Sequence, residues 1–537
     1  MTHTLITALQ NPALYDHPVT ALTLVETHIS WVILTGPFAY KIKKPVNLGF
    51  LDFSTLPLRQ QYCEAELRLN KRLAPEYYLS VVAITGTASA PRWQGEGPAI
   101  EYAVKMRQFP QAMELDRIAK SGQLRRVHLE QLAADVADFH ATLPKAEASM
   151  TYGDPDAVWQ PIAENFQQLQ PCCQSVTSRE QLASLHDWCV ASHAELLALL
   201  QQRKSTGCIR ECHGDMHLAN MFLAQERVVV FDCIEFNPAL RWIDVISEIA
   251  FLTMDLRDRR HPELARCFLD RYLQHSGDYA GLALLNYYQV YRAMVRAKVA
   301  CIRLQQADLN ATESKQLAVE TQDYLALGEH FTRTTTPTLF ITHGLSGSGK
   351  TFFTDALIAA FDVVRVRSDV ERKRLVGLSA TAKTDSGVDS GLYAAEMGAR
   401  TYAQLASAAN DILHSGYHAL VDATFLQQAQ RAQFAQLAHE LNVPMVILHF
   451  TATPETLQRR IQSRQRNACD ASEADLPVLQ RQRERVEPLT TAEQVNTIEI
   501  DTETTNASEK LLATVQQAIY AMADYKEMDH IRPYIIR

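Results

Sequence analysis

The sequence predicts two domains of different fold class: a two-lobed α+β domain, followed by an α/β domain built on a parallel sheet. Three observations predict this arrangement. In the first hundred residues, β-branched and aromatic runs predominate, and long stretches with helical periodicity follow them. After residue 337, strand-like and helical runs alternate, as they do in parallel sheets. Between these regions, Phe331 to Pro337 is polar and Thr-rich and ends in proline, which is typical of a linker.

The chain has 537 residues, which is too long for one ordinary hydrophobic core. We therefore place domain boundaries from the composition shifts. The expected parts are an N-terminal domain over 1–330 (a small lobe over about 1–108 and a large lobe over about 109–330), a linker over 331–337, a second domain over 338–525 and a tail over 526–537.

Composition excludes several classes of protein. The chain is 47% hydrophobic and 21% charged, and its net charge of −9 argues against broad affinity for nucleic acid. The sequence shows neither a membrane-spanning apolar run nor a secretory signal. Its ten cysteines have no metal-like spacing, and we expect reduced thiols. These features favour a cytoplasmic protein, and they leave the oligomeric state open.

Periodicity predicts the elements of the N-terminal domain. The expected strands lie within 29–43 and 79–84, and the expected helices lie within 59–73, 128–143, 182–202 and 282–306.

A group of polar residues in the large lobe points to phosphoryl transfer. The stretch from Cys212 to Asn220 reads Cys-His-Gly-Asp-Met-His-Leu-Ala-Asn, and a strand at 228–231 then delivers Asp232. Phosphoryl transfer of the kinase type needs a carboxylate beside the acceptor hydroxyl, and an Asn and a second Asp to hold Mg²⁺. Asp215 and Asn220 are five residues apart, the spacing of the loop H-R-D-x-x-x-x-N. The alternative is an ordinary turn, with Asp232 capping a helix.

This stretch resembles the aminoglycoside phosphotransferase-like family, in which the loop reads H-G-D-x-x-x-x-N and the fold is the bilobal fold of protein kinases. The resemblance covers about 25–330 and is strongest in the loop. It implies that Asp215 is the catalytic base and that Asn220 and Asp232 are Mg²⁺ ligands. The sequence departs from the kinase pattern at Gly214, and at Cys233-Ile234, which stand where kinases have Phe-Gly.

The nucleotide-clamping lysine is expected on a strand of the small lobe, paired with a glutamate on the next helix. Lys41 and Lys43 alternate on one predicted strand and so share one face. We prefer Lys41, with Lys43 second, and on the helix we prefer Glu66 to Glu64. The alternative is a solvated basic edge strand, since lysine is usually exposed. A G-x-G-x-x-G loop does not precede these residues.

The second domain opens with a more specific motif. A predicted strand at 338–342 and a predicted helix at 352–360 flank a stretch that fits G-x-x-x-x-G-K-[ST], the phosphate-binding P-loop. Its backbone N–H groups and the start of the helix favour phosphate oxygens. Lys350 would reach the β- and γ-phosphates, and the Thr351 hydroxyl would hold Mg²⁺. The nucleotide-binding candidates are Gly344, Leu345, Ser346, Gly347, Ser348, Gly349, Lys350 and Thr351.

Residues after the next predicted strands supply candidates for catalysis. Further strands are expected at 363–366, 417–421, 445–450 and 497–500. Asp369 is a candidate base for an acceptor hydroxyl, and Arg372 a candidate clamp for an anionic group on the acceptor. The alternative is a helix N-terminus with a solvated basic face. Asp422 ends the third strand and is a candidate for organising Mg²⁺.

The remaining candidates lie further along the second domain. Thr424 and Arg431 follow Asp422 and are expected on the acceptor side. Arg464 and Arg466 belong to an Arg-rich helix that precedes an acidic loop, which is typical of a mobile lid whose guanidinium groups reach phosphates. A charged surface helix is the alternative.

This half resembles small P-loop kinases of the polynucleotide-kinase, gluconate-kinase and zeta-toxin kind, over about 338–520. The whole chain is similar to bacterial proteins that fuse an aminoglycoside phosphotransferase-like domain to an AAA-type, P-loop kinase-like ATPase domain. Both resemblances imply ATP and Mg²⁺ as cofactors.

The leading functional hypothesis is a phosphotransferase with two nucleotide sites, each passing the γ-phosphoryl group of MgATP to a hydroxyl of a small molecule. Two alternatives stay open. The chain could be a P-loop ATPase or kinase that carries a degenerate kinase-fold module with a binding or regulatory role. Its C-terminal half could instead phosphorylate 5′-hydroxyl ends of nucleic acid, although the acidic composition makes nucleic acid an unlikely partner.

Overall fold

The computed structural model describes residues 2–19, 21–49, 51–305, 309–380, 382, 395–466 and 474–529. The chain folds into two compact units. The first comprises Met1–Arg260 and Tyr291–Leu325, and the second His261–Val290 and Ala326–Arg537. This division differs from the boundary expected at 331–337, because a segment at 261–290 joins the second unit. Two of the three boundaries, after residues 290 and 325, fall within helices.

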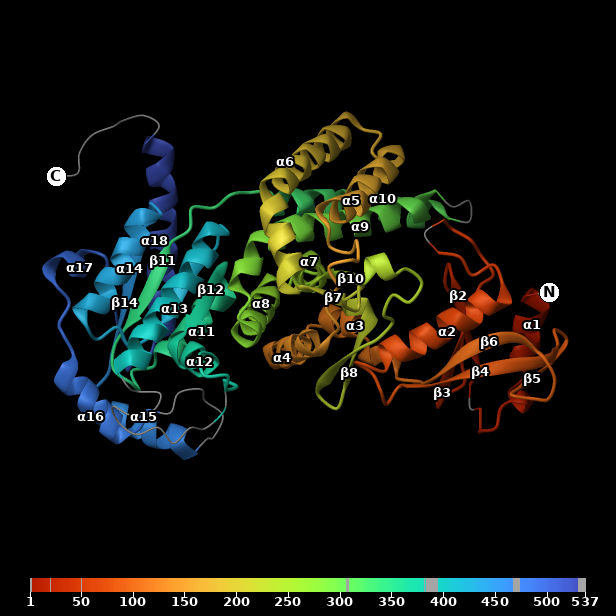
Figure 1. Ribbon diagram of the computed structural model, residues 1–537, viewed down its shortest axis with the longest axis horizontal. Coiled ribbons are helices and arrows are strands. Elements are labelled where there is room, and N and C mark those ends of the chain that lie inside the picture. The colour runs from red at the N-terminus through yellow and green to blue at the C-terminus, as the bar shows by residue number, and fades with distance from the viewer. Residues whose placement is uncertain are drawn as a thin grey trace. The chain divides into compact units, whose positions relative to one another are not determined.

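The first unit begins with a six-stranded antiparallel sheet of order β1-β2-β3-β6-β4-β5. Helix α2 (Leu56–Asn70) lies along this sheet against β4 and β6 (Figure 1). The strands are β1 (Thr23–Glu26), β2 (Ser30–Leu34), β3 (Phe38–Lys43), β4 (Tyr78–Thr87), β5 (Ala90–Trp93) and β6 (Ala99–Arg107).

Strand alternation in β3 separates an apolar face from a charged one. Tyr40 and Ile42 pack in a cluster with Trp31 and with Leu5 of helix α1 (Thr2–Leu9). The lysines of β3 therefore point to the opposite face, toward α2. Thr55 caps α2 by accepting a hydrogen bond from the Leu58 N–H at 3.4 Å, which fixes where the helix starts.

The rest of the first unit is mainly helical, as the periodicity predicted. Two short antiparallel pairs of strands lie among its helices: β7 (Ile209–Glu211) pairs with β10 (Trp242–Asp244), and β8 (Met221–Ala224) forms a hairpin with β9 (Arg227–Val230). The helices are α3 (Leu115–Lys120), α4 (Arg126–Thr142), α5 (Pro155–Leu169), α6 (Val176–Thr206), α7 (Val245–Asp258), α9 (Leu285–Leu304) and α10 (Ala311–Phe331).

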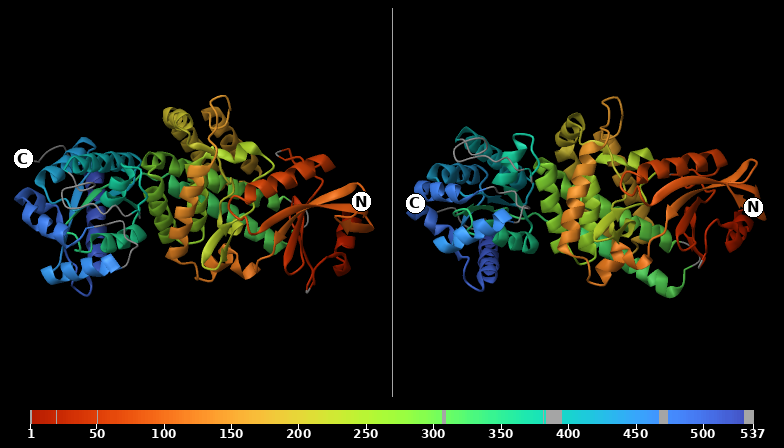
Figure 2. Two further views of the ribbon diagram at one scale, coloured as in Figure 1. Left: turned by 60° about the horizontal axis from the view of Figure 1, so that its bottom comes forward. Right: turned by 90° about the horizontal axis from the view of Figure 1, so that it is seen from below.

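The second unit contains the predicted parallel sheet, of order β12-β13-β11-β14-β15, with helices on both faces (Figures 1 and 2). The fold class predicted for both halves is confirmed. The strands are β11 (Leu339–His343), β12 (Val363–Arg367), β13 (His418–Asp422), β14 (Met445–Thr451) and β15 (Thr497–Asp501). The helices are α8 (Pro262–Ser276), α11 (Lys350–Ala360), α12 (Ser368–Arg374), α13 (Ala395–His414), α14 (Gln428–Glu440), α15 (Pro454–Arg466), α16 (Leu476–Arg485), α17 (Thr491–Val495) and α18 (Ala507–Asp529).

One apolar cluster fixes the helix that follows the phosphate-binding motif. Phe353 and Leu357 of α11 pack with Phe340 of β11, Leu448 of β14 and Leu511 of α18, and all five are buried. Burying a side chain of this size contributes about 1.5–3 kcal/mol. The start of α11 is thus held against the carboxyl end of β11.

Buried polar contacts attach helix α8 to strand β12 of the second unit. The Asp270 carboxylate accepts a hydrogen bond from the Arg365 backbone N–H at 3.0 Å and lies 3.5 Å from its guanidinium. That guanidinium also pairs with Asp355 at 2.8 Å and donates to the Thr351 carbonyl at 3.2 Å. One arginine of β12 therefore joins α8 to the first turn of α11.

A disulfide bond joins Cys172 to Cys301, 129 residues apart in the chain. The expectation that the cysteines are all reduced thiols is therefore wrong for this pair. Spacing along the sequence could not reveal the bond, because the fold alone brings Cys172 beside α9. Among the described residues, seven other cysteines are free thiols. None of the described helices is long and apolar enough to cross a membrane.

We expect Cys172→Ser to lower the free energy of unfolding of the first unit by about 2–5 kcal/mol, because the bond closes a long loop in the unfolded chain. Thermal unfolding with and without reductant measures this. Reductant should destabilise the parent protein and leave Cys172→Ser unaffected. Equal unfolding curves for the parent in both conditions would contradict the prediction.

Candidate functional site

The large lobe gathers its predicted residues around one loop. The Asn220 side-chain amide donates to the Asp215 carboxylate at 2.7 Å and to the Asp215 carbonyl at 3.0 Å. His217 lies 3.3 Å from the same carboxylate. Burial opposes the ionised form, but the neighbouring His217 and the nearby His213 lower the pKa of Asp215 below its ordinary value. Asp215 is therefore an ionised carboxylate held in a fixed orientation.

Buried side chains that the sequence did not single out hold the backbone of this loop. The Glu248 carboxylate of α7 accepts hydrogen bonds from the His213 N–H at 2.6 Å and the Gly214 N–H at 2.8 Å. Arg292 of α9 donates to the Gly214 carbonyl at 3.1 Å. Gly214 has a φ of +89°, and a Cβ there would lie 2.6 Å from the Leu240 carbonyl oxygen. Glycine replaces the kinase arginine because another residue would not fit.

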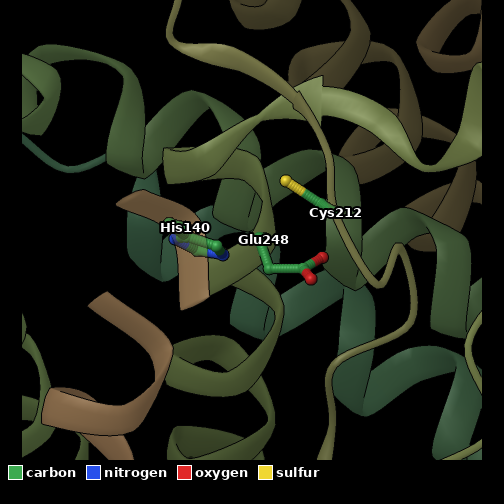
Figure 3. A group of neighbouring side chains, drawn as sticks. All are labelled: His140, Cys212 and Glu248. Atoms are coloured by element: carbon green, nitrogen blue, oxygen red, sulfur yellow. The ribbon is translucent and has the colours of Figure 1, made fainter. Parts of the chain in front are cut away.

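His140, Cys212 and Glu248 each place a metal-ligating atom within 4.8 Å of the others (Figure 3). Both Glu248 oxygens already accept backbone N–H groups. Burial raises the pKa of the Cys212 thiol well above its ordinary value, and a metal would require the thiolate. We therefore interpret this cluster as support for the loop rather than as a metal centre.

The small lobe brings both predicted lysines to a buried group of carboxylates. Lys41 pairs with Glu66 at 2.9 Å and also with Asp232. Lys43 pairs with Glu66 at 2.7 Å and also with Glu235. Burial works against charged lysine, but Asp232 and Glu66 raise the pKa of Lys41 well above its ordinary value. The preferred lysine and glutamate are thus joined to the predicted metal ligand, and Glu64 is not part of this network.

Asp232 adopts an unusual backbone conformation, with a φ of +62°. Its N–H donates to the Tyr78 hydroxyl oxygen at 3.2 Å. A positive φ strains a non-glycine residue, and such residues are enriched where a side chain must be aimed at a ligand. With the Asn220 amide, the Asp232 carboxylate offers the oxygen donors that suit Mg²⁺, so the residues fit this ion.

Aromatic rings adjoin these polar residues. Phe222 lies two residues after Asn220, and Phe231 directly precedes Asp232. Phe109 comes from the connection between the lobes and stacks on Phe222, with ring centroids 3.9 Å apart and planes 4° apart. Its centroid is 5.2 Å from that of Phe231. Phe222 is buried, whereas Phe109 and Phe231 are half-buried, and rings of this kind suit a planar base beside a phosphate site.

In the second unit, the phosphate-binding loop has the expected backbone shape. Gly344, Gly347 and Gly349 all have positive φ. A Cβ at Gly344 would lie 2.5 Å from the Phe450 carbonyl oxygen, so only glycine fits there. Lys350 donates to the carbonyls of Gly344 at 2.8 Å and Leu345 at 2.9 Å, which curls its ammonium group over the loop.

The predicted metal-binding pair also meets in this unit. The Thr351 hydroxyl donates to the Asp422 carboxylate at 2.7 Å, and Arg367 lies 3.8 Å from the same carboxylate. A hydroxyl from the first turn of α11 and a carboxylate from the end of β13 are the arrangement that holds Mg²⁺ beside a phosphate loop. These residues therefore fit Mg²⁺ as well.

A cavity of about 680 Å³ begins at this loop. It extends past Asp422 to Asp369 and Arg372, which lie 3.2 Å apart, and to a row of glutamines on and before α14. Predicted residues in its lining are Ser346, Gly347, Gly349, Lys350, Thr351, Asp369, Arg372, Asp422, Thr424 and Arg464. Gly344, Leu345 and Ser348 lie in the loop but are not among the residues that line the cavity.

Arg431 does not fit its expected role as an acceptor ligand. Its side chain is fully buried and pairs with Glu493 at 2.7 Å, and it donates to the carbonyls of Phe425, Glu487 and Pro488. It ties α14 to the 487–493 segment. Arg464 donates to the Ala474 carbonyl at 2.7 Å, and the side chain of Arg466 lies outside the described residues.

Sequence reasoning missed one more residue at this loop. Gln482 of α16 accepts a hydrogen bond from the Ser346 N–H at 2.8 Å and donates to the Ser346 hydroxyl at 3.0 Å. No spacing rule links a glutamine to a loop 136 residues earlier. Its place on the helix after the predicted lid was the only available signal.

Two protein-family models each match a part of this chain. Residues 60–285 match the model described as phosphotransferase enzyme family, and residues 339–489 match the model described as AAA domain. The chain therefore contains a region similar to the phosphotransferase enzyme family, followed by a region similar to AAA domains. The resemblance stated from the loop at 212–220 and the P-loop at 344–351 is thus confirmed.

Relatives share both halves of the chain. Proteins of Mycobacterium tuberculosis and Mycobacterium bovis, both described as uncharacterized, are 29% identical over 459 residues, covering 85% of this chain and 89% of theirs.

Solved structures match one half at a time. An amicoumacin kinase in complex with AMP-PNP and Ca²⁺ covers 60% of this chain and 93% of its own, at 14% identity and a TM-score of 0.38. A putative kinase from Chloroflexus aurantiacus covers 35% of this chain and 98% of its own, at 20% identity and a TM-score of 0.29. Kti12 from Chaetomium thermophilum covers 34% of this chain and 98% of its own, at 13% identity and a TM-score of 0.26.

Lys350 gives nucleotide binding a pH dependence. Burial lowers the pKa of Lys350 from 10.5 to about 8, and phosphate oxygens favour its protonated form. Above pH 8, binding must therefore take up a proton, and we expect affinity at this site to fall by up to about tenfold per pH unit. Calorimetry at pH 9 in buffers of different ionisation enthalpy measures the uptake. Lys350→Arg, which stays protonated, should show none, and equal uptake by both proteins would contradict the assignment.

Proposed function

We propose that the chain is an ATP-dependent phosphotransferase with two nucleotide sites, each of which transfers the γ-phosphoryl group of MgATP to a hydroxyl of a small molecule. The two matched families support nucleotide-dependent phosphotransfer in general. The two-site assignment and the acceptor are our own inference from the residues.

The observation that carries the proposal is that the cavity in the second unit extends beyond the phosphate-binding loop. An enzyme that only hydrolyses nucleotide needs room for a water molecule beyond the γ-phosphate. Here the cavity of about 680 Å³ continues past Lys350 and Thr351 to Asp369 and Arg372. A carboxylate at the far end of a phosphate site can take the proton of an acceptor hydroxyl, and a guanidinium beside it can hold an anionic group of the acceptor.

The first unit supports the proposal by the arrangement of its loop. Asp215 is ionised and oriented by Asn220, so it can accept a hydrogen bond from an acceptor hydroxyl and take its proton. Lys41, paired with Glu66, would hold the nucleotide phosphates, and the ring of Phe109, which rests on buried Phe222, would stack with the base. Mg²⁺ bound to Asn220 and Asp232 would neutralise charge on the phosphates.

Separate loss of turnover tests the two sites. We expect Asp215→Asn to remove the part of ATP turnover due to the first unit, by at least about a hundredfold, because general-base catalysis contributes that much. Lys350→Ala should abolish nucleotide binding in the second unit. Release of γ-phosphate from ATP, with and without a pool of metabolites, measures both.

A protein that carries both Asp215→Asn and Lys350→Ala should release no γ-phosphate. Any release by this double variant measures contaminating ATPase and is subtracted as the control. Turnover that Asp215→Asn leaves unchanged under all conditions would remove the first unit from the proposal. Nucleotide binding that survives in the second unit of Lys350→Ala would remove the second.

Asp369→Asn separates transfer from binding in the second unit. The substitution removes the proton acceptor but keeps the size of the side chain, so MgATP should still bind while acceptor phosphorylation falls by about 10²–10⁴-fold. A nucleotide-binding isotherm and a transfer assay on the same protein measure this. If Asp369→Asn left phosphoryl transfer unchanged, Asp369 would not be the proton acceptor, and its role would be to pair with Arg372.

One observation favours a second candidate function for the first unit, that of a binding module. The turn between β1 and β2 is Thr27-His28-Ile29, which offers no glycine to cover a triphosphate. Titrating the Lys350→Ala chain with MgATP distinguishes the two, because a module with a degenerate site would not bind the nucleotide.

A further inference from the structure

The small lobe carries two buried lysines where kinase-type chemistry uses one. This inference rests on the function proposed for the first unit. Lys41 and Lys43 alternate on β3 and share the Glu66 carboxylate, which is fully buried between them. Only 12% of the Lys41 side chain and 1% of the Lys43 side chain are exposed.

The two lysines differ in their second partner. Lys41 reaches Asp232, whose side chain is 41% exposed and is a predicted ligand of Mg²⁺. Lys43 reaches Glu235, whose side chain is 4% exposed, and its ammonium lies 4.8 Å from the centre of the Phe53 ring. Lys41 thus faces the open side of the cluster, and Lys43 faces the closed side.

The charges of the closed side balance only with Lys43 present. Glu66 and Glu235 contribute two negative charges and the lysines two positive charges, while Asp232 remains for a cation. A buried carboxylate that loses its partner is strongly unfavourable. Without Lys43, the ammonium of Lys41 would be the one cation of this cluster left to neutralise both Glu66 and Glu235.

We propose that Lys43 is a positioning residue that frees Lys41 for the nucleotide. Because Lys43 pairs with Glu235 and shares Glu66 with Lys41, Lys41 can leave Asp232 and turn to the phosphates while it stays beside Glu66, so no buried carboxylate loses its cation. Asp232 is then released to Mg²⁺. Lys43 itself does not touch the nucleotide and acts through Lys41.

MgATP binding to the full chain tests this, in the Lys350→Ala background that leaves only the site of the first unit. We expect Lys43→Met to weaken MgATP binding by about tenfold, because Lys41 is then retained by the carboxylates. Adding Glu235→Gln to Lys43→Met restores the charge balance and should recover most of the loss. This double variant also protects against misfolding, since it replaces a buried ion pair by neutral groups.

A double-mutant cycle shows whether Lys43 acts through Lys41. In a Lys41→Met background, adding Lys43→Met should change affinity by no more than about twofold, because the residue through which it acts is gone. A purely structural or long-range electrostatic role would produce the same loss in both backgrounds. Arg59→Met is the matched control: it breaks the buried Arg59–Glu101 pair of the same lobe at 2.9 Å, and should lower the melting temperature without changing the affinity of the folded protein.

Three results would overturn the inference. Unchanged affinity in Lys43→Met, or a loss that is equal in the Lys41→Met background, would overturn it while leaving the proposed function intact. Absence of any MgATP binding by the Lys350→Ala parent would instead overturn the function proposed for the first unit, and this inference with it.

Discussion

A single buried carboxylate fixes the loop on which the first unit depends. Glu248 is fully buried and accepts the backbone N–H groups of His213 and Gly214. Hydrogen bonds to a charged acceptor are about twice as strong as neutral ones, and each unsatisfied buried N–H would cost about 1–3 kcal/mol. The position of Asp215 follows from this anchoring, because it is the next residue along the chain. Asn220 and Asp232 are then placed by backbone pairing that starts from the same loop.

The second unit anchors its phosphate site by a different principle. Glycines with positive φ shape the loop itself, and side chains lock its surroundings. Gln482 holds Ser346 from one side, and Arg365 holds the Thr351 carbonyl from the other. The first unit thus relies on a charged side chain beneath the backbone, whereas the second relies on backbone conformations that only glycine adopts readily.

The sequence was sufficient wherever a function needs fixed spacing along the chain. The P-loop, the Asp215–Asn220 spacing and the alternation of Lys41 and Lys43 are local patterns, and the strands of the parallel sheet follow from local periodicity. Contacts between distant residues were not accessible in this way. Glu248, Gln482 and the Cys172–Cys301 bond join residues between 34 and 136 positions apart, and side chains of these types have no distinctive spacing. Arg431 was misjudged for the same reason, since its partner Glu493 lies 62 residues away.

The course of the chain through the second unit has a consequence for its synthesis. Asp270 of α8 is made 95 residues before Arg365, the buried cation that it contacts. At about 5–20 residues per second, a ribosome needs roughly 5–20 s to supply that partner. Through this interval helix α8 lacks the residue of β12 that Asp270 contacts in the folded unit. The second unit can therefore close only late in translation, so a nascent chain of this protein exposes α8 to chaperones long after the helix has left the ribosome.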